Sequence, residues 1–277
     1  MKRIKIRLPE MRWEIDSEYD AMAERLIGTE TARVICVSSC AKEASRGAVS
    51  LLLARKLAQK GCRVVLMDMD LQKTMPLSRI QVKNEGSTGF TRWLARGCAF
   101  SEILLQTNID GLFMVLAGAP TNDGTKLLRE NRVGQLLESL KKSFDYILMD
   151  IPPITESVDS TLVAELCDGA LLIVEAGKTD ADFAQKTAGR FESAGCPVLG
   201  VVLNNADVWR NRRYFSKYGP SEKKEPKVAY AVSGTDDEHA GDPELEKQKR
   251  IRAAYAVSGT DDEHAGDVRV QDTEERT

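Results

Sequence analysis

Six near-continuous apolar runs, separated by longer amphipathic stretches, constrain the fold of this chain more than any other feature. The runs cover residues 33–37, 64–67, 112–116, 146–149, 170–174 and 198–203. Runs of this kind are typical of parallel strands that are buried on both faces. The amphipathic stretches, each long enough for a crossover helix, include 50–60, 123–142, 157–167 and 180–194. The sequence therefore predicts an α/β fold with a doubly wound, mainly parallel sheet, which binds ligands at the carboxyl ends of its strands.

Charge and hydropathy exclude several kinds of function. The 277-residue chain has a net charge of −3, which argues against a dedicated nucleic-acid-binding protein. No apolar run approaches the ~20 residues needed to cross a bilayer, so we expect no direct membrane insertion. The basic N-terminus lacks the apolar segment of a signal peptide, and the six cysteines lie far apart without a C-x-x-C pair. We therefore expect a cytoplasmic protein with reduced thiols.

The composition changes from Gly219 to the end of the chain. This segment holds 15 Asp and Glu against 9 Lys and Arg and contains no Phe or Trp. It cannot bury enough surface to offset chain entropy, so we expect it to be largely disordered. The chain is accordingly divided into an N-terminal segment (1–30), a sheet-forming domain (31–210) and a tyrosine-containing tail (211–277).

The tail also contains a duplication. Residues 229–242 read A-Y-A-V-S-G-T-D-D-E-H-A-G-D, and residues 254–267 repeat the same fourteen letters. Two polar copies cannot form a solenoid, which needs at least three units that bury a shared core. Two interpretations remain: a recent duplication of neutral linker, or a duplicated short linear motif centred on Tyr230 and Tyr255.

Three carboxylates follow two of the predicted strands. Asp68 and Asp70 come directly after run 64–67, and Asp150 follows run 146–149. Carboxylates at the ends of parallel strands point into the crevice above the sheet, where such an Asp commonly holds Mg²⁺ in a phosphate-binding enzyme. A capping or loop role is the alternative for each of them singly. Their joint placement beside one loop favours a functional site.

That loop has the position of a phosphate-binding loop but not its composition. Residues 38–49 read S-S-C-A-K-E-A-S-R-G-A-V, between a strand-like run and a helical stretch. A tight loop between strand and helix lets backbone N–H groups surround a phosphate, but the usual glycines and lysine are missing. Beyond the last strand, Asn204 and Asp207 form an N-x-x-D pattern without the lysine of guanine-reading motifs, so GTP specificity is not expected.

With these residues placed, the chain resembles the bacterial tyrosine kinases (BY-kinases) of capsule and exopolysaccharide synthesis, of the cytoplasmic CpsD/CapB type. The second nucleotide element of that family reads like L-L-I-D-A-D-L-R-R-P and corresponds to residues 65–74. The third reads like Y-D-Y-V-I-I-D-T-P-P and corresponds to residues 144–153. Shorter landmarks of the family lie at 157–159, 168–169, 176–179 and 203–204. The similarity extends over residues 17–218.

The resemblance implies a P-loop NTPase-type kinase domain in residues 31–210, with ATP and Mg²⁺ as cofactors. In an active member, Asp68 and Asp70 would serve the metal and the deprotonation of the attacking phenol. Asp150 would orient the metal through water, so that Asp68 and Asp150 are the metal-site residues. The implied cofactor-binding residues are Ser45, Arg46, Gly47 and Asn204, the last of them beside the adenine.

The phosphate loop is where the chain departs from the family. The family's G-E-G-K-S-T aligns with residues 43–48, so that Glu43 and Ser45 replace glycines and Arg46 replaces the lysine. Glu43 places a repulsive carboxylate near the phosphates, and Gly47 lacks the hydroxyl that holds Mg²⁺. Arg46 keeps the charge as a bulky planar fork. We therefore expect weakened or lost binding of Mg-ATP.

The resemblance also suggests partners. A family member of this type works with a membrane-spanning polysaccharide co-polymerase, which would recruit it to the inner face of the membrane. The family's N-terminal helix packs subunits into a ring, and Glu18–Leu26 keeps only part of that motif, so a homo-oligomer is an open expectation. The expected phosphoacceptors are Tyr214, Tyr218, Tyr230 and Tyr255.

Three functions follow from this resemblance. The leading hypothesis is a regulatory or adaptor component in the control of capsular or exopolysaccharide synthesis. The alternative is an active ATP-dependent protein-tyrosine autokinase in which Arg46 replaces the lysine in binding the β- and γ-phosphates. A positioning ATPase similar to ParA or MinD comes last, because Lys42 lies one place away from the extra lysine of those proteins and Tyr214 and Tyr218 would have no role.

Overall fold

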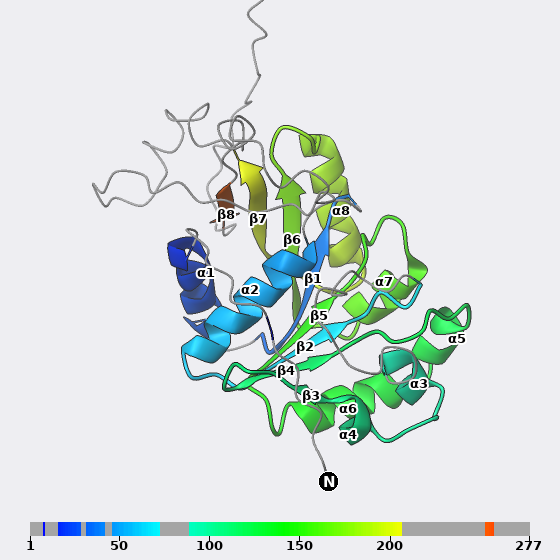
Figure 1. Ribbon diagram of the computed structural model, residues 1–277. Helices are drawn as coiled ribbons and strands as arrows, with labels where there is room; N and C mark the ends of the chain where they lie inside the picture. Colours follow the sequence, from blue (N-terminus) through cyan, green and yellow to red (C-terminus); the bar gives the residue numbers. More distant parts are fainter. Residues whose placement is uncertain are drawn as a thin grey trace, which may run out of the picture.

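The computed structural model describes residues 8, 16–28, 32–41, 46–72 and 89–206, together with the backbone of residues 253–257. The strands in these ranges are β1 (Val34–Ser39), β2 (Val64–Asp68), β3 (Leu105–Gln106), β4 (Leu112–Val115), β5 (Tyr146–Asp150), β6 (Gly169–Glu175), β7 (Val198–Ala206) and β8 (Ala253–Val257). They form one sheet in the order β3-β4-β2-β5-β1-β6-β7-β8 (Figure 1). The six inner strands are parallel, and the two outer strands run antiparallel to their neighbours.

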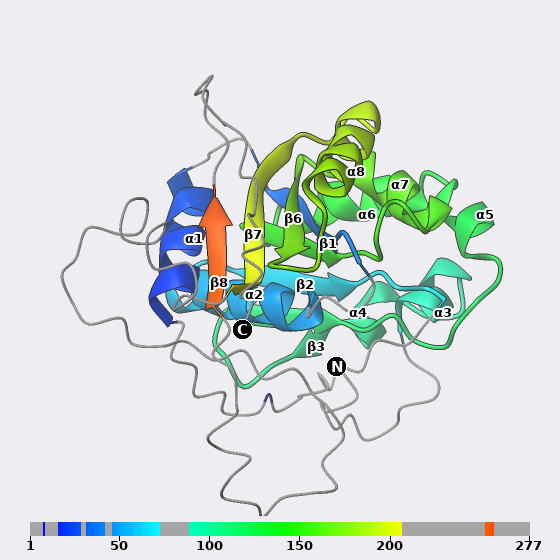
Figure 2. The ribbon, with the colours of Figure 1, turned by 90° about the horizontal axis from the view of Figure 1, so that it is seen from above.

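Helices cover both faces of the sheet. They are α1 (Asp16–Gly28), α2 (Arg46–Gln59), α3 (Phe90–Leu94), α4 (Phe100–Ile103), α5 (Gly124–Leu128), α6 (Arg132–Leu140), α7 (Val158–Ala164) and α8 (Ala181–Ser193). α1 and α2 lie on one face and the other six pack on the opposite face, as Figures 1 and 2 show. The result is the three-layer arrangement that a doubly wound sheet requires.

The alternation of side chains along the strands fills two separate cores. In β1, Ile35 and Val37 pack with the α1–α2 layer, whereas Val34 and Cys36 pack with the other helices. All four side chains are completely buried. Because both faces of a central strand are covered, its sequence reads as a continuous apolar run rather than as an alternating pattern.

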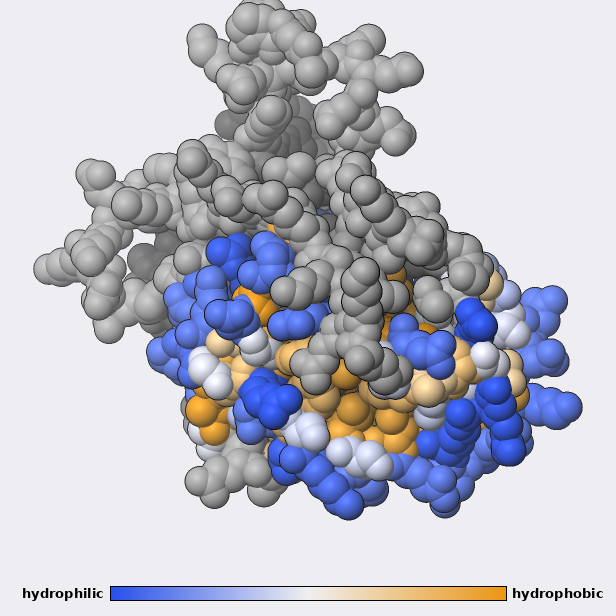
Figure 3. Space-filling view, turned by 60° about the horizontal axis from the view of Figure 1, so that its bottom comes forward, coloured by the Kyte–Doolittle hydropathy of each residue, from blue (hydrophilic) through white to orange (hydrophobic). Residues whose placement is uncertain are grey.

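The surface of the described residues is mixed in character. Figure 3 shows a face on which apolar side chains gather in the middle and hydrophilic side chains lie around them. Large apolar side chains with substantial exposure in the described ranges are Ile27, Val158 and Phe183. Of the helices in the described part of the chain, none combines the length and the apolar character needed to cross a membrane.

The structure corrects the predicted elements in three places. The stretch 123–142 forms two helices, α5 and α6, because the chain turns at residues 129–131. The short elements α3, α4 and β3 carry no strong periodic pattern and were not predicted. Residues 253–257, which lie in the tail expected to be largely disordered, form strand β8 against β7. The remaining tail residues lie outside the described ranges.

Candidate nucleotide site at the carboxyl ends of the central strands

The sheet order brings the sequence-predicted carboxylates together. β5 lies between β1 and β2, and its register places Asp150 opposite Asp68 on β2 and opposite Val37 on β1. Both Asp68 and Asp150 end their strands and are buried. Asp70 follows two residues later, and its backbone N–H donates to Oδ1 of Asp68 over 3.1 Å. The carboxylates therefore form one cluster at the carboxyl edge of the sheet, next to the first turn of α2.

Arg46, the first residue of α2, points into this cluster. Its Nε atom lies 2.6 Å from Oδ1 of Asp150, and its Nη2 atom lies 3.8 Å from Oδ2 of Asp70. The Arg46 side chain is only 5% exposed, so the ion pair with Asp150 is shielded from water. Charge-assisted hydrogen bonds of this length are among the strong ones in proteins. The guanidinium is thus bound to the protein's own carboxylates.

Ser50 adds a second contact from the same helix. Its hydroxyl donates to Oδ1 of Asp150 over 3.2 Å, and the side chain is completely buried. Ser50 lies four residues after Arg46, and residues at this spacing share one face of a helix. Sequence reasoning missed Ser50. The spacing from Arg46 was the signal that would have identified it.

The pKa values in the cluster follow from burial and from this pairing. Burial and, to a smaller extent, the neighbouring Asp150 carboxylate raise the pKa of Asp68 to about 7, and the hydrogen bond from the N–H of Asp70 acts against this rise. Burial also raises the pKa of Asp150, and the Arg46 guanidinium and the Ser50 hydroxyl act against that rise. Near neutral pH the cluster therefore keeps a proton on Asp68 in part of the molecules, because the guanidinium lies closest to Asp150.

The residues of the cluster do not fit Mg²⁺ while Arg46 lies here. A divalent ion held by Asp68 and Asp150 would have to bind beside a guanidinium that already contacts Oδ1 of Asp150. Within the described residues, no three His, Cys, Asp or Glu side chains are grouped as metal ligands would be. Oδ2 of Asp150 is buried and has no hydrogen-bond partner among the described residues.

Hydroxyl groups fix the turn that follows Asp150. The carbonyl oxygen of Pro152 accepts hydrogen bonds from Ser38 Oγ over 3.0 Å and from Ser160 Oγ over 2.9 Å. The family landmark at residues 157–159 has a structural explanation as well. Asp159 is buried and accepts a hydrogen bond from Thr125, which ties α7 to α5. In these contacts the hydroxyl groups of Ser38, Ser160 and Thr125 bind other protein groups, and we assign them a structural role at the border of the site.

The end of β7 provides unpaired polar groups at a different point of the rim. Asn204 is 1% exposed, and its Nδ2 atom has no hydrogen-bond partner among the described residues. The next residue, Asn205, has a positive φ of 59° and donates from Nδ2 to Oε1 of Glu175 over 2.6 Å. Its Oδ1 atom is likewise buried and without a partner in the described chain. A donor and an acceptor are therefore left for a polar ligand such as a nucleobase.

Glu175 is held from a second direction. Lys178 donates to the same Oε1 atom over 2.7 Å, so a lysine and an asparagine share one buried carboxylate oxygen. Both Glu175 and Asn205 were missed by sequence reasoning. Asn205 was recognisable only from its backbone, because a non-glycine residue at positive φ is uncommon and often marks a functional turn.

The other predicted site residues are placed as follows. Gly47 follows Arg46 in the first turn of α2 and is half-buried. Ser45, Tyr214, Tyr218 and Tyr230 lie outside the described residues. Tyr255 lies in β8, where its backbone pairs opposite Leu203.

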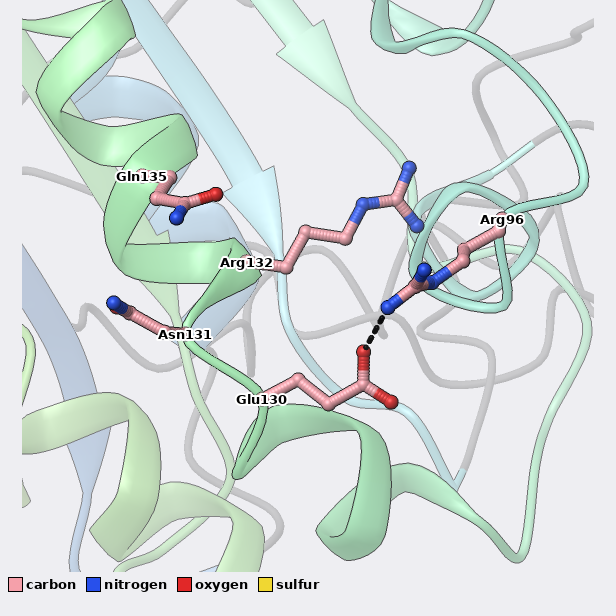
Figure 4. Close-up of a pocket in the computed structure, with 5 residues that line it drawn as sticks. All are labelled: Arg96, Glu130, Asn131, Arg132 and Gln135. Atoms are coloured by element: carbon pink, nitrogen blue, oxygen red, sulfur yellow. Dashed lines mark hydrogen bonds and ion pairs between the residues drawn. The ribbon is translucent and has the colours of Figure 1, made fainter.

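A surface pocket of about 440 Å³ lies between α3, α5 and α6, and none of the residues that line it is a predicted site residue (Figure 4). Arg96 and Glu130 form an ion pair of 3.0 Å across it. Arg132 donates to the backbone oxygens of Trp93 and Leu94 and lies 4.2 Å from the centre of the Trp93 ring. Both arginines of the pocket are thus bound to protein groups, so we do not propose the pocket as an anion-binding site.

Comparison with known proteins gives consistent matches. Residues 32–176 match a family model described as an AAA domain. The tyrosine-protein kinase CpsD of Streptococcus pneumoniae serotype 4 is 30% identical over 195 residues, which are 70% of this chain and 86% of that protein.

Two solved structures share the fold. The crystal structure of the VpsO kinase domain has a TM-score of 0.62 and 24% identity and covers 68% of this chain and 93% of its own. The septum site-determining protein MinD of Pyrococcus horikoshii, complexed with Mg-ADP, has a TM-score of 0.52 and 20% identity and covers 61% of this chain and 68% of its own. At these identities the two structures show the fold alone. They confirm the predicted α/β, doubly wound sheet of P-loop NTPase type.

Proposed function

Because this chain belongs to the bacterial tyrosine kinase family that includes CpsD, we propose that it is a regulatory or adaptor component in the control of capsular or exopolysaccharide synthesis, with weakened or lost binding of Mg-ATP. The family expected from the sequence motifs is thereby confirmed. The loss of ATP binding, the adaptor role and the pathway are our proposal.

A single observation carries the proposal, namely the contact between Arg46 and Asp150. By family resemblance, Arg46 stands where a lysine would meet the β- and γ-phosphates. Its guanidinium instead lies 2.6 Å from Asp150 in a buried setting. Drawing Arg46 toward a phosphate would leave Asp150 buried without its partner, and breaking a buried pair in this way typically costs about 3–5 kcal/mol. Phosphate binding through Arg46 would therefore lower the stability of the domain.

The proposed adaptor would act through its partner and its tail. By family resemblance, the partner is a membrane-spanning polysaccharide co-polymerase, which would recruit this chain to the inner face of the cell membrane. Tail tyrosines would receive phosphate from an active relative. Each phosphate adds about −1.5 to −2 charge and changes which basic surfaces the tail can meet.

As part of the same proposal, we expect self-association through α1 to be weak. Two acidic residues of α1 are paired with lysines of the same chain. Lys56 lies 3.2 Å from Asp20, and Lys60 lies 2.8 Å from Glu24, so α2 neutralises two acids of α1. Since these pairs already exist in one chain, a neighbouring subunit gains little by offering another cation.

The second candidate function is an active autokinase, and a specific observation favours it. Buried polar atoms of Asp150, Asn204 and Asn205 have no hydrogen-bond partners within the described residues. Buried polar atoms are normally paired, so a nucleotide could be the missing partner. A positioning ATPase remains the third candidate, and its main support is the similarity of the fold to that of MinD.

Calorimetric titration of the full chain with ATP, with and without Mg²⁺, tests the proposal. We expect no binding at millimolar ATP, while circular dichroism shows a folded protein. Micromolar binding that depends on Mg²⁺ and is lost in Asp68→Asn would overturn the proposed loss of ATP binding and favour the active kinase.

A further inference from the structure

A segment of the acidic tail occupies the edge of the sheet. β8 pairs antiparallel with β7, so that Ala256 lies opposite Val202 and Tyr255 opposite Leu203. Figure 2 shows β8 between β7 and α1, and residues of α1 and β8 approach one another. The sheet therefore ends in a strand that comes from the repeated part of the tail.

The pairing with β8 provides hydrogen-bond partners for backbone groups on the free edge of β7. On its other side β7 pairs with β6, so without β8 it would be an edge strand of nine residues. Long edge strands present a row of unpaired N–H and C=O groups and are prone to pair with whatever strand is available. The register with β8 covers positions 201–203 and 206 of this edge.

The sequence contains the strand-forming segment twice. A-Y-A-V at 254–257 makes up most of β8 and opens the repeat 254–267, and A-Y-A-V at 229–232 opens the identical repeat 229–242. Tyr and Val favour strands, and the Ser-Gly that follows in both copies favours a turn. Because strand pairing is made by backbone groups, an identical segment can form the same ladder.

We propose that the β7 edge is a docking site for either copy of the A-Y-A-V segment and that the two copies exchange on it. At any moment one copy lies in the sheet and the other is presented to partners. One of Tyr230 and Tyr255 is therefore held against the domain while the other is exposed. This inference does not depend on whether ATP binds.

The relative occupancy follows from the tethers. Both copies are attached to the chain that leaves Ala206, so docking is intramolecular and is governed by effective concentration. The tether to the first copy is about half as long as the tether to the second, which favours the first copy about threefold when the −3/2 power of length applies. Both copies are therefore populated on the edge.

Hydrogen–deuterium exchange of β7 in the full chain tests the proposal. Successive amides of a strand point to opposite sides, so two adjacent prolines remove a ladder donor whichever side faces β7. The variants are A231P/V232P in the first copy, A256P/V257P in the second, and the combination of all four substitutions. The control is A240P/A265P, which places proline at matching positions in the acidic half of both copies.

The effects of the two pairs of proline substitutions on the exchange rate of β7 amides are expected to be non-additive. In each two-proline variant, the β7 amides should exchange at a rate within about fourfold of the wild-type rate, because the remaining copy covers the edge. The four-proline variant should accelerate exchange of the edge-facing amides by about tenfold or more, because no copy is left to protect them. The control variant should behave like the wild type.

Several results would overturn the proposal. If A256P/V257P alone exchanges as fast as the four-proline variant, the edge accepts only the second copy. If the four-proline variant retains wild-type protection, the tail does not dock. If protection of β7 falls on dilution, the strand comes from another molecule. If the control also exchanges fast, A-Y-A-V alone does not suffice for docking.

Discussion

The Nε atom of Arg46 lies 2.6 Å from Oδ1 of Asp150, and both side chains are almost completely buried. The pair joins the first turn of α2 to the end of β5, across the cluster in which the family motifs predict a nucleotide. A cation supplied by the protein itself thus lies among the carboxylates that the family motifs predict to hold a metal ion.

The first prediction concerns the stability of this pair. Arg46→Ala should lower the free energy of unfolding by about 3–5 kcal/mol, because it leaves Asp150 as a buried carboxylate without its cation. Arg96→Ala is the matched control, since Arg96 is largely exposed and also pairs with an acid, Glu130. The control should cost less than about 1 kcal/mol. Urea denaturation of both variants provides the comparison, and equal effects would contradict a stabilising role for the buried pair.

The second prediction concerns pH. The pKa of Asp68 is raised from 3.8 to about 7 in the folded protein, so the folded state binds this proton more tightly than the unfolded state does. The stabilisation from this proton is fully present below pH about 4 and is lost as the pH rises toward 7. The wild type should therefore lose stability relative to Asp68→Asn across this window, by up to about 4 kcal/mol.

Denaturation midpoints at several pH values, converted to free energies, measure this difference. Asp123→Asn removes an exposed carboxylate and serves as the control. If the difference between wild type and Asp68→Asn were constant from pH 4 to pH 8, the raised pKa would be wrong.

The third prediction restores the phosphate loop. The combination of Glu43→Gly, Ser45→Gly, Arg46→Lys and Gly47→Ser returns the residues that normally hold the phosphates and the metal. We expect this variant to gain ATP binding that depends on Mg²⁺, measured by calorimetry against the wild type. Adding Asp150→Asn to the same variant should remove the Mg²⁺ dependence. A restored loop that binds no better than the wild type would show that the loop is not what limits binding.

The fourth prediction concerns phosphorylation of the tail. We expect phosphotyrosine on Tyr214, Tyr218, Tyr230 or Tyr255 only when an active relative is co-expressed, because the chain itself binds Mg-ATP poorly. Mass spectrometry of the purified protein identifies the modified residues. Asp68→Asn should carry the same phosphotyrosine as the wild type under co-expression. Phosphotyrosine on the wild type expressed alone, and absent from Asp68→Asn, would instead indicate autophosphorylation.

Much of the fold was predictable from local pattern. The six apolar runs correspond to the six parallel strands, because a strand covered on both faces is apolar over most of its length. The placement of Asp68 and Asp150 at strand ends was also evident, since each follows directly on its apolar run. The split between α5 and α6 was not predicted, because the amphipathic pattern continues through the turn between them.

The class of fold, the family and the residues that border the site were predictable from the sequence, because strand periodicity and motif spacing are local properties of the chain. The contacts of Arg46 and Ser50 with Asp150, about a hundred positions away, became evident from the folded structure. Contacts of this range depend on the order of strands in the sheet, which places β5 beside β1 and so brings α2 over Asp150. The same holds for β8, because its pairing with β7 is made by backbone groups, and the strand-favouring residues of β8 do not identify the strand with which it pairs.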